Sequence, residues 1–342
     1  MLNHRFVFYL VIFVAFLIAT GCSKDVQDEL KNPNALEIPE GFPSVVFPLG
    51  NEYTPERWAL GKRLFYDPIL SLSNKVSCAS CHLASNAFSD TIPLSLGDNN
   101  EIGFSNSPTL ANIAYHPYYT SAGGVPTLEM QILVPVQEHN EFNSNILDIV
   151  EELKLDPSYV SQIKIAYNRE PDAFSITRAI ANFERSLISG GSNFDNYTFR
   201  GNKEALTDIE QQGLKLFMSE KTNCSKCHSG FNFTNYAFEN NGLYLNYIDS
   251  GRMRLTHLEE DRAKYKVPSL RNIALTKPYM HDGSFKTLKE VIEHYNSGGK
   301  NHTNKNGLIK PLNLTSEEKE QLIAFLNALT DHSFITNKLY RK

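Results

Sequence analysis

Two short segments of this 342-residue sequence contain the same reactive residues at the same spacing: KVSCASCHLA at 75–84 and TNCSKCHSGF at 222–231. In each, two cysteines stand three positions apart and a histidine follows the second. Two thiols at this spacing can add to the vinyl groups of a haem, and the adjoining histidine can bind its iron. The pattern therefore indicates two covalently bound haem c groups. The residues that would hold them are Cys78, Cys81, His82, Cys224, Cys227 and His228.

Three other uses of paired cysteines account for fewer of these residues. A thioredoxin-like redox site needs no adjoining histidine and belongs in a βαβ setting, which this sequence does not suggest. A zinc site with four thiolates would leave both histidines unexplained and would have to join cysteines that lie far apart in the chain. Disulfides within each pair would close very short loops, which stabilise a fold poorly.

The start of the chain predicts export, which fits the attachment of c-type haem outside the cytoplasm. A short basic start leads into an apolar run that ends at Ala19-Thr20-Gly21-Cys22. The run is too short to span a membrane and is typical of a secretory signal. Its end resembles a bacterial lipoprotein box, although Ala19 stands where leucine is usual. We expect a signal over 1–21, a lipid anchor on Cys22, a tether over 22–50, and a location in the periplasm or cell envelope. An ordinary cleaved signal with an incidental cysteine is the alternative.

The composition limits the class of partner. The net charge is −5, from 33 Lys and Arg against 38 Asp and Glu, which argues against nucleic acid. The 21 phenylalanines and 16 tyrosines supply ample core material. The length suits two domains, and no segment after the signal is long and apolar enough to cross a membrane.

The similarity between the two halves extends beyond the cysteines. Upstream of the motifs, LGKRLFYD at 60–67 resembles QGLKLFMS at 212–219. Downstream, SPTLANIAYHPYY at 107–119 resembles VPSLRNIALTKPYM at 267–280. Each copy continues to a Thr-Leu pair, at residues 127–128 and 287–288. The chain is therefore a tandem repeat of two related haem domains.

Helical signals dominate both copies. Thr54-Pro55 and the capping box Thr207-Asp208-Ile209-Glu210 begin the helices that enter each haem loop. The segment 174–189 carries one apolar stripe, and a capped final helix begins at Thr315. Strand signals are scarce, so we predict a mainly α fold with long loops around the cofactors. The glycine- and asparagine-rich segment 190–202 is the expected boundary.

After residue 50 the sequence resembles the bacterial dihaem cytochrome c peroxidase family, which includes the MauG proteins. The resemblance is carried by LGKRLFYDPILSLSNKVSCASCH, NSPTLANIA, LEMQILVP, AIANFERSLISGGSNFD and KVPSLRNIALTKPYMHDGSFKTL. It implies two cytochrome c-like domains in tandem, an N-terminal peroxidatic one over 51–195 and a C-terminal electron-transfer one over 203–342, with calcium between them. It also implies reduction of hydrogen peroxide by electrons from a small cytochrome c or another periplasmic donor, and a possible homodimer.

The resemblance also assigns site residues. Glu141 matches the family's catalytic glutamate and Gln131 its companion glutamine, with Pro135 between them. A residue that moves a proton during peroxide cleavage typically contributes on the order of 10²–10⁴ in rate. Taken alone, Glu141 is a solvated loop carboxylate, and Glu138 lies close enough to compete for the role. The implied calcium ligands, which offer hard oxygen atoms, are Asn106, Thr276 and Pro278.

Two positions of the family pattern are occupied by residues of a different type. The distal histidine of many family peroxidases falls at Asp98, which leaves His116 and His139 as possible substitutes. The tryptophan usually found between the haems falls at Ser121, and the one tryptophan, Trp58, is expected in the core. Aromatic residues that could bridge the haems instead are Tyr118 and Tyr119.

A third difference concerns the second haem. The axial methionine of ordinary family peroxidases falls at Tyr295, where tyrosine is the MauG-like ligand. A tyrosine oxygen stabilises ferric iron, whereas methionine raises the potential. Rival ligands are Met280, Met253 and His294. Three functions follow as hypotheses: a dihaem peroxidase, a MauG-like oxidase acting on residues of a partner protein, or a non-catalytic dihaem electron carrier.

Overall fold

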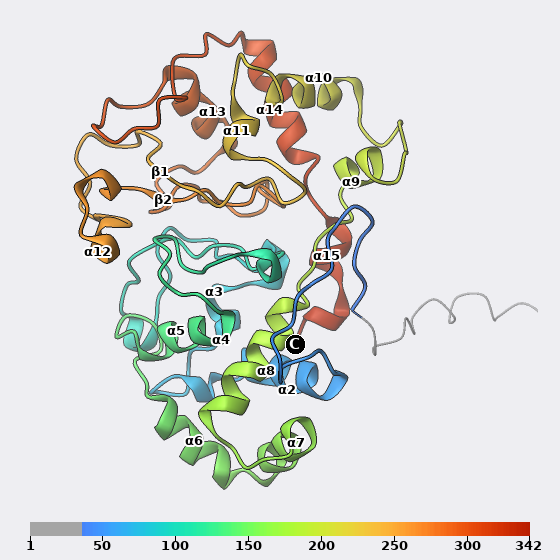
Figure 1. Ribbon diagram of the computed structural model, residues 1–342, viewed down its shortest axis with the longest axis vertical. Coiled ribbons are helices and arrows are strands. Elements are labelled where there is room, and N and C mark those ends of the chain that lie inside the picture. Colours follow the sequence, from blue (N-terminus) through green and yellow to red (C-terminus); the bar gives the residue numbers. More distant parts are fainter. Residues whose placement is uncertain (1–35) are drawn as a thin grey trace, which may run out of the picture. The chain divides into compact units, whose positions relative to one another are not determined.

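Helices provide most of the regular structure in residues 36–342, the part of the chain that the computed structural model describes. The only strands in this range are β1 (Phe238–Glu239) and β2 (Tyr265–Lys266), which pair in antiparallel fashion (Figure 1). The predicted mainly α fold with long loops is confirmed. The expected signal and the anchor residue Cys22 lie outside the described residues.

The helices follow the order of the repeat (Figure 1). Those of the first copy are α2 (Pro55–Tyr66), α3 (Cys78–Cys81), α4 (Leu128–Gln131), α5 (Leu133–Gln137), α6 (Ile146–Leu155), α7 (Pro157–Tyr167) and α8 (Ala173–Arg185). Those that follow are α9 (Asn193–Thr198), α10 (Asp208–Phe217), α11 (Cys224–Cys227), α12 (Met253–Thr256), α13 (Leu288–Ser297), α14 (Ser316–Asn327) and α15 (His332–Thr336).

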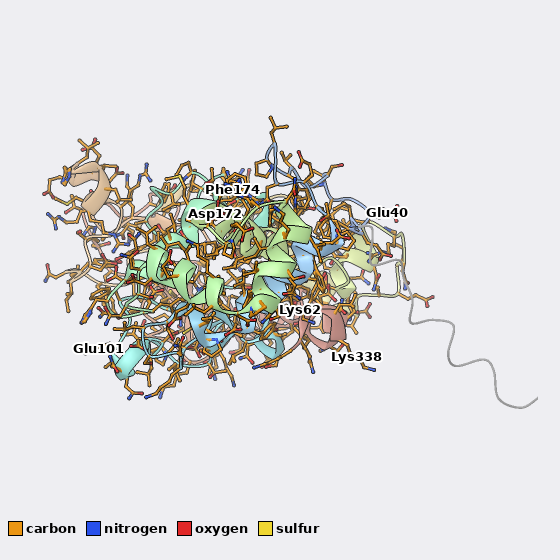
Figure 2. All side chains as sticks on the ribbon, turned by 90° about the horizontal axis from the view of Figure 1, so that it is seen from below. Glu40, Lys62, Glu101, Asp172, Phe174 and Lys338 are labelled. Atoms are coloured by element: carbon orange, nitrogen blue, oxygen red, sulfur yellow. The ribbon has the colours of Figure 1, made fainter. Side chains whose placement is uncertain are left out.

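The predicted helix starts are confirmed by their caps. Thr54 accepts a hydrogen bond from the Arg57 amide at 3.2 Å at the start of α2. Capping boxes begin α10 at Thr207 and α14 at Thr315. Helix α8 follows the N-cap residue Asp172, which is labelled in Figure 2, and the Asp172 side chain accepts from the Ser175 amide at 2.8 Å. These bonds satisfy amides that have no partner within the helix.

A glycine sets the same close helix crossing in both copies. A Cβ atom on Gly61 of α2 would lie 1.9 Å from the Ala179 carbonyl oxygen of α8. A Cβ on Gly213 of α10 would lie 1.9 Å from the Gln321 carbonyl oxygen of α14. Any side chain at either position would force the helices apart. The crossing therefore explains why LGKRLF and QGLKLF share their glycine.

Two large hydrophobic clusters form the cores, and a third, small one lies within the first copy. The first draws on residues 60–187 and the second on residues 194–329, in agreement with a boundary near 190–202. Helix α15 does not follow this division, because Phe334 belongs to the first cluster and its ring lies 5.7 Å from that of Phe88. The division into domains 51–195 and 203–342 stays a proposal, with residues 332–340 packed on the first core.

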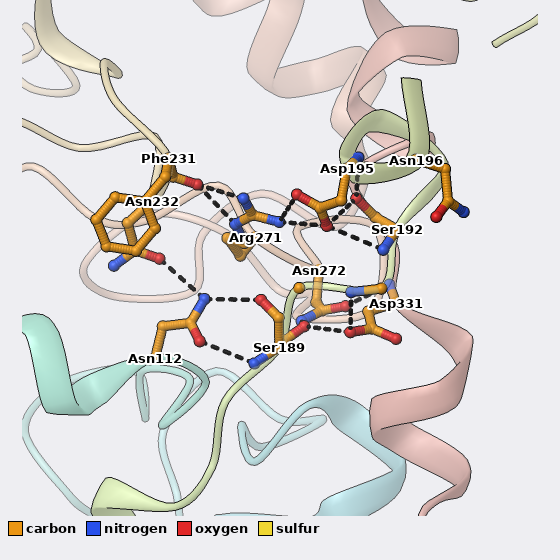
Figure 3. A network of polar contacts seen from close by, with 12 residues as sticks. Asn112, Ser189, Ser192, Asp195, Asn196, Phe231, Asn232, Arg271, Asn272 and Asp331 are labelled. Atoms are coloured by element: carbon orange, nitrogen blue, oxygen red, sulfur yellow. Dashed lines mark hydrogen bonds and ion pairs between the residues drawn. The ribbon is translucent and has the colours of Figure 1, made fainter. Parts of the chain in front are cut away.

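Buried polar side chains join the repeats (Figure 3). Asn112 donates to the Ser189 carbonyl at 2.9 Å and to Asn232 at 3.2 Å. Its counterpart Asn272 donates to the Ser189 hydroxyl at 2.9 Å, and that hydroxyl donates to Asp331 at 3.1 Å. Each amide therefore finds a partner across the boundary, which fixes how the copies meet.

An ion pair lies beside this network. The Arg271 guanidinium contacts both carboxylate oxygens of Asp195 at 2.7 Å, and both side chains are fully buried (Figure 3). Arg271 also donates to the Phe231 carbonyl at 2.8 Å. Separating the two residues would leave an unpaired buried charge, which is costly. The ion pair therefore holds the start of α9 against the segment 267–280.

Candidate haem and peroxide site

The first CxxCH motif forms one short helix with a fixed histidine. Helix α3 holds Cys78 and Cys81, and the His82 amide donates to the Cys78 carbonyl at 3.0 Å. The His82 Nδ1 atom lies 2.9 Å from the Phe88 carbonyl oxygen, which leaves Nε2 for a metal. Burial lowers the pKa of His82 and so favours the neutral imidazole that binds iron.

The second motif repeats this geometry. The His228 amide donates to the Cys224 carbonyl at 2.9 Å, and Nδ1 lies 3.1 Å from the Phe233 carbonyl oxygen. Burial lowers the pKa of His228 as well. None of the four described cysteines forms a disulfide, so the thiols are available. Free thiols and a histidine oriented through Nδ1 are the donors that covalent haem c requires, so the residues fit the group.

Gln131 and Glu141 lie on the two sides of α5. Gln131 ends α4, and its Oε1 atom is buried without a hydrogen-bond partner among the described residues. Glu141 follows α5, and its side chain is accessible. Burial raises the pKa of both Cys78 and Cys81, and the Glu141 carboxylate raises each further. Glu141 therefore lies near the first haem motif.

The Glu141 carboxyl has an environment suited to holding a proton. Although the side chain is accessible, the surrounding protein atoms raise its pKa, and the charge of Glu138 raises it further. The Glu141 amide donates to the Glu138 carbonyl at 3.0 Å, so the two residues share one turn. A carboxyl that keeps its proton more readily is the type that can exchange protons with a substrate.

Asp98 anchors the loop that carries Glu141. Its amide donates to the Glu141 carbonyl at 2.6 Å, and its side chain is fully buried. One carboxylate oxygen accepts from Ser73, whereas the other has no partner among the described residues. A Cβ on Gly97 would lie 2.1 Å from the Asn140 carbonyl, so the two loops touch. The sequence showed only a missing histidine here and did not reveal this anchor.

A second carboxyl near the first haem motif was also missed. Glu184 lies on α8, inside the predicted core stripe, and is 6% exposed. Burial raises its pKa to about 8, against the opposing charge of Arg185. Its charge also raises the pKa of Cys78. The sequence signal for Glu184 was a charged residue inside an apolar stripe. Its neighbour Arg185 forms an ion pair with Glu129 at 2.6 Å.

Tyr295 lies on α13 close to the second haem motif. Burial raises its pKa to about 12, the Asn241 side chain bonds the phenol, and the charges of Cys224 and Cys227 act on it. The Asn241 amide nitrogen also lies 3.3 Å from the Met280 sulfur. The structure thus brings Tyr295 and Met280 together around Asn241.

The other two rivals lie in different settings. The His294 Nε2 atom is 3.0 Å from the Asn241 carbonyl oxygen, so this nitrogen is engaged by the backbone. Met253 begins α12. Tyr295 and Met280 are therefore the two candidates that the structure brings together beside the second motif.

Asn106 contacts the second repeat. Its amide donates to the His281 carbonyl at 2.9 Å, and its side-chain nitrogen donates to the Ile92 and Pro93 carbonyls. Thr276 and Pro278 lie in the segment before His281. The described part of the chain has no cluster of three His, Cys, Asp or Glu residues suited to a metal ion.

The substitutes for the missing histidine differ in burial. His139 is exposed, and its Nδ1 lies 3.2 Å from Asn143. His116 lies 3.2 Å from the Lys266 ammonium, and burial, with the Lys266 charge, lowers the pKa of His116 to about 3. Its Nε2 atom is buried without a partner in the described range. His116 thus belongs to the contact between repeats.

The aromatic residues that could bridge the two haems also lie in different places. Tyr118 stacks on Phe238 of the second copy, with ring centroids 5.1 Å apart. Tyr119 is buried within the first copy. Trp58 donates to Ser186 at 2.8 Å and packs on the first core, as expected. Of the two tyrosines, Tyr118 is the one that spans the repeats.

None of the helices in residues 36–342 has the length and apolar character needed to cross a membrane.

Comparisons with known proteins cover both repeats. Residues 55–204 match the family model of di-haem cytochrome c peroxidase, and residues 211–330 match that of cytochrome c. The methylamine utilization protein MauG of Methylorubrum extorquens is 35% identical over 289 residues, covering 84% of this chain and 81% of that protein. Cytochrome c551 peroxidase of Nitrosomonas europaea is 34% identical over 277 residues, covering 79% of each.

Solved structures agree. A MauG-like protein associated with microbial copper homeostasis aligns with a TM-score of 0.85 and 33% identity, covering 89% of this chain and 97% of that one. The dihaem peroxidase BthA of Burkholderia thailandensis aligns with a TM-score of 0.73 at 21% identity, covering 87% of this chain and 95% of that one, which supports the fold alone.

Proposed function

The chain belongs to the di-haem cytochrome c peroxidase family, and from that premise we propose that it reduces hydrogen peroxide to water. The electrons come from a small external donor such as a cytochrome c. Relatives named cytochrome c peroxidase, at 31–34% identity, support this reaction. The observation that carries the proposal is the position of Glu141 beside the first CxxCH motif.

The residues of the first repeat perform the proton transfer. When bound, the first haem would supply an iron that binds peroxide and the electrons that break its O–O bond. Glu141 takes a proton from one peroxide oxygen and delivers it to the other, which leaves as water. The raised pKa of its carboxyl favours the protonated form needed for delivery. The unpartnered Oε1 atom of Gln131 accepts a hydrogen bond from peroxide and orients it.

The second repeat receives electrons. His228 and Tyr295 are the proposed ligands of its haem, and the Asn241 contact holds the Tyr295 phenol in place. A phenolate ligand stabilises ferric iron and lowers the potential, so the donor must be a stronger reductant than one suited to a methionine-ligated haem.

Several accessory features belong to the proposal. Calcium binds between the repeats, held by Asn106, Thr276 and Pro278, whose amide and carbonyl oxygens suit that ion. Cys22 carries a lipid anchor, which places the enzyme at the outer side of a membrane in the periplasm or cell envelope. The protein functions as a monomer or a homodimer.

Tyr295 favours a second candidate, a MauG-like oxidase that uses the same chemistry on residues of a partner protein. The similarity to proteins named MauG, at 32–35% identity, supports it. A non-catalytic electron carrier has no comparable support, because it needs neither Glu141 nor an open iron position.

Steady-state turnover of peroxide with a reduced small cytochrome c tests the first candidate, beside the electron paramagnetic resonance spectrum of the resting protein. Turnover with a high-spin ferric signal supports the peroxidase. An absence of turnover despite a high-spin signal favours the oxidase, and two low-spin signals without turnover favour the carrier.

A further inference from the structure

A cluster of aromatic rings lies in the second repeat, outside the residues assigned above. Its members are Tyr244, Tyr247, Tyr265, His281 and His302. The Tyr265 and His281 rings stack with centroids 4.1 Å apart and planes 21° apart. Tyr247 lies 5.8 Å from His281 and 5.2 Å from His302. The rings thus touch one another as a continuous group.

The cluster reaches from the surface to the second haem site. Tyr244 is 37% exposed, and its ring lies 5.4 Å from that of Tyr247. Tyr247 is close enough to Tyr295 for its phenol to affect the pKa of Tyr295. An oxidisable side chain at the surface therefore contacts the ring of Tyr247, and the Tyr247 phenol lies near the proposed ligand of the second haem.

Tyr244 also has a proton acceptor. Its hydroxyl donates to Asp282 Oδ2 at 2.6 Å, and Asp282 Oδ1 accepts from the Ser284 amide at 3.1 Å. A phenol loses its proton when it loses an electron, so a carboxylate at this distance lets both leave together. The buried Tyr159 makes a similar bond to Asp67, at 2.6 Å, but is 1% exposed and cannot meet a donor.

We propose that Tyr244 is the residue through which this protein takes electrons from an external one-electron reductant, with Asp282 accepting and returning its proton. The proposal rests on the peroxidase function. Tyr244 gives one electron toward the second haem site while its proton moves to Asp282, leaving a tyrosyl radical and a carboxylic acid. The reductant then supplies one electron, and the proton returns to the phenol. Two such cycles deliver the two electrons that peroxide needs, with two protons from solvent, to give two waters.

The test uses the protein with both haems, mixed with hydrogen peroxide without a donor and frozen rapidly. Electron paramagnetic resonance measures the tyrosyl radical. In parallel, a nitroso spin trap followed by peptide mass spectrometry locates it. We expect the trap adduct on Tyr244. Tyr244→Phe should remove that adduct and most of the signal, and Asp282→Asn should lower the radical yield severalfold.

Two further variants sharpen the result. Tyr247→Phe removes the oxidisable phenol between Tyr244 and Tyr295 and leaves the surface residue in place, so the adduct on Tyr244 should be lost. Tyr197→Phe is the control, because Tyr197 is partly exposed, lies outside the cluster and contacts Lys203 instead of a carboxylate. It should leave the adduct and the signal unchanged.

The haem absorption spectrum of the same samples distinguishes a failure of the peroxidase function from a failure of the role of Tyr244. If peroxide leaves the spectrum unchanged, the peroxidase function is wrong and this inference falls with it. If the spectrum responds but the adduct forms on another residue, or the signal is the same in Tyr244→Phe, the inference alone is overturned.

Discussion

The two repeats hold their histidines alike but differ on the distal side of each proposed haem. In both, histidine Nδ1 contacts the carbonyl of a phenylalanine, and a glycine sets the helix crossing. Counted from the helix caps Thr127 and Thr287, Pro135 occupies the register position of Tyr295, eight residues on in each copy (127 + 8 and 287 + 8). Proline has no side-chain donor, so this position of the first copy cannot supply a ligand of the kind that Tyr295 is proposed to supply in the second.

The helices that contain these two positions also differ. In the second repeat, α13 runs unbroken over Leu288–Ser297 and presents Tyr295. In the first, the equivalent stretch divides into α4 and α5, and the chain after α5 turns back to bring Glu141 near Cys78 and Cys81. The two repeats therefore share one fold, and the segment that follows Thr127 or Thr287 gives each repeat its own proposed role.

Loss of either histidine ligand should have the largest effect, and a different one in each copy. His82→Gly should abolish the reaction with peroxide, because the first iron loses its protein ligand. His228→Gly should chiefly impair electron entry, so that peroxide still reacts once with the first haem. Stopped-flow absorption measures the single reaction and steady-state assays the turnover. A reaction with peroxide that requires His228 and not His82 would reverse the roles.

Glu141→Gln should lower turnover by about 100-fold or more, because it removes the acid/base group and keeps its shape. Both haems and the ferric spectra should stay as in the wild type. Glu138→Gln is the matched control, because Glu138 lies in the same turn. Wild-type turnover in Glu141→Gln together with loss in Glu138→Gln would move the role to Glu138.

Tyr295→Met should raise the potential of the second haem and leave the first unchanged, since axial ligands tune haem potentials over roughly 0.8 V. Redox titration of the two haems measures this. The resting wild type should show a high-spin first haem and no sulfur-to-iron band, so it should react with peroxide without prior reduction. A strong sulfur band with two low-spin signals would instead identify Met280 as the ligand.

Removal of calcium should lower turnover severalfold and loosen the contact between the repeats, because Asn106 comes from one copy and Thr276 and Pro278 from the other. Turnover in chelator, with metal analysis of the same sample, measures the effect. Asn106→Ala should reproduce it without chelator. Full activity in a sample shown to be free of calcium would remove the ion from the proposal.

The smallest effect concerns Lys266, which contacts His116 where the repeats meet. Burial lowers the pKa of Lys266 to about 8, below its usual value near 10.5. Between these two pH values Lys266 holds its proton in the unfolded chain more than it does in the folded protein. The free energy of unfolding therefore rises with pH because of this residue, by at most about 1.4 kcal/mol per pH unit. Chemical unfolding between pH 8 and 9.5 should show a smaller rise for Lys266→Met. Equal slopes in the two proteins would contradict the burial of the charge.

The features that sequence could predict are local ones. The CxxCH helices and the caps at Thr54 and Thr207 follow from residues close together in the chain, where short-range rules apply, and the repeat follows from comparing such local segments with one another. The buried roles of Asp98 and Glu184 depend on distant partners. Asp98 meets Ser73 and the Glu141 backbone only after two loops pack together, and Glu184 is buried by the fold around α8. No pattern around Asp98 carries that information, and for Glu184 the sequence offers only a charged residue inside an apolar stripe.

The packing of α15 on the first core has a consequence for the order of folding. Phe334 is synthesised long after Phe88, yet the two rings are in contact within the first core. The first repeat therefore cannot complete its interior until α15 has been synthesised. A nonsense mutation just before His332 would damage the N-terminal half of the molecule first, although every residue of that half would still be present.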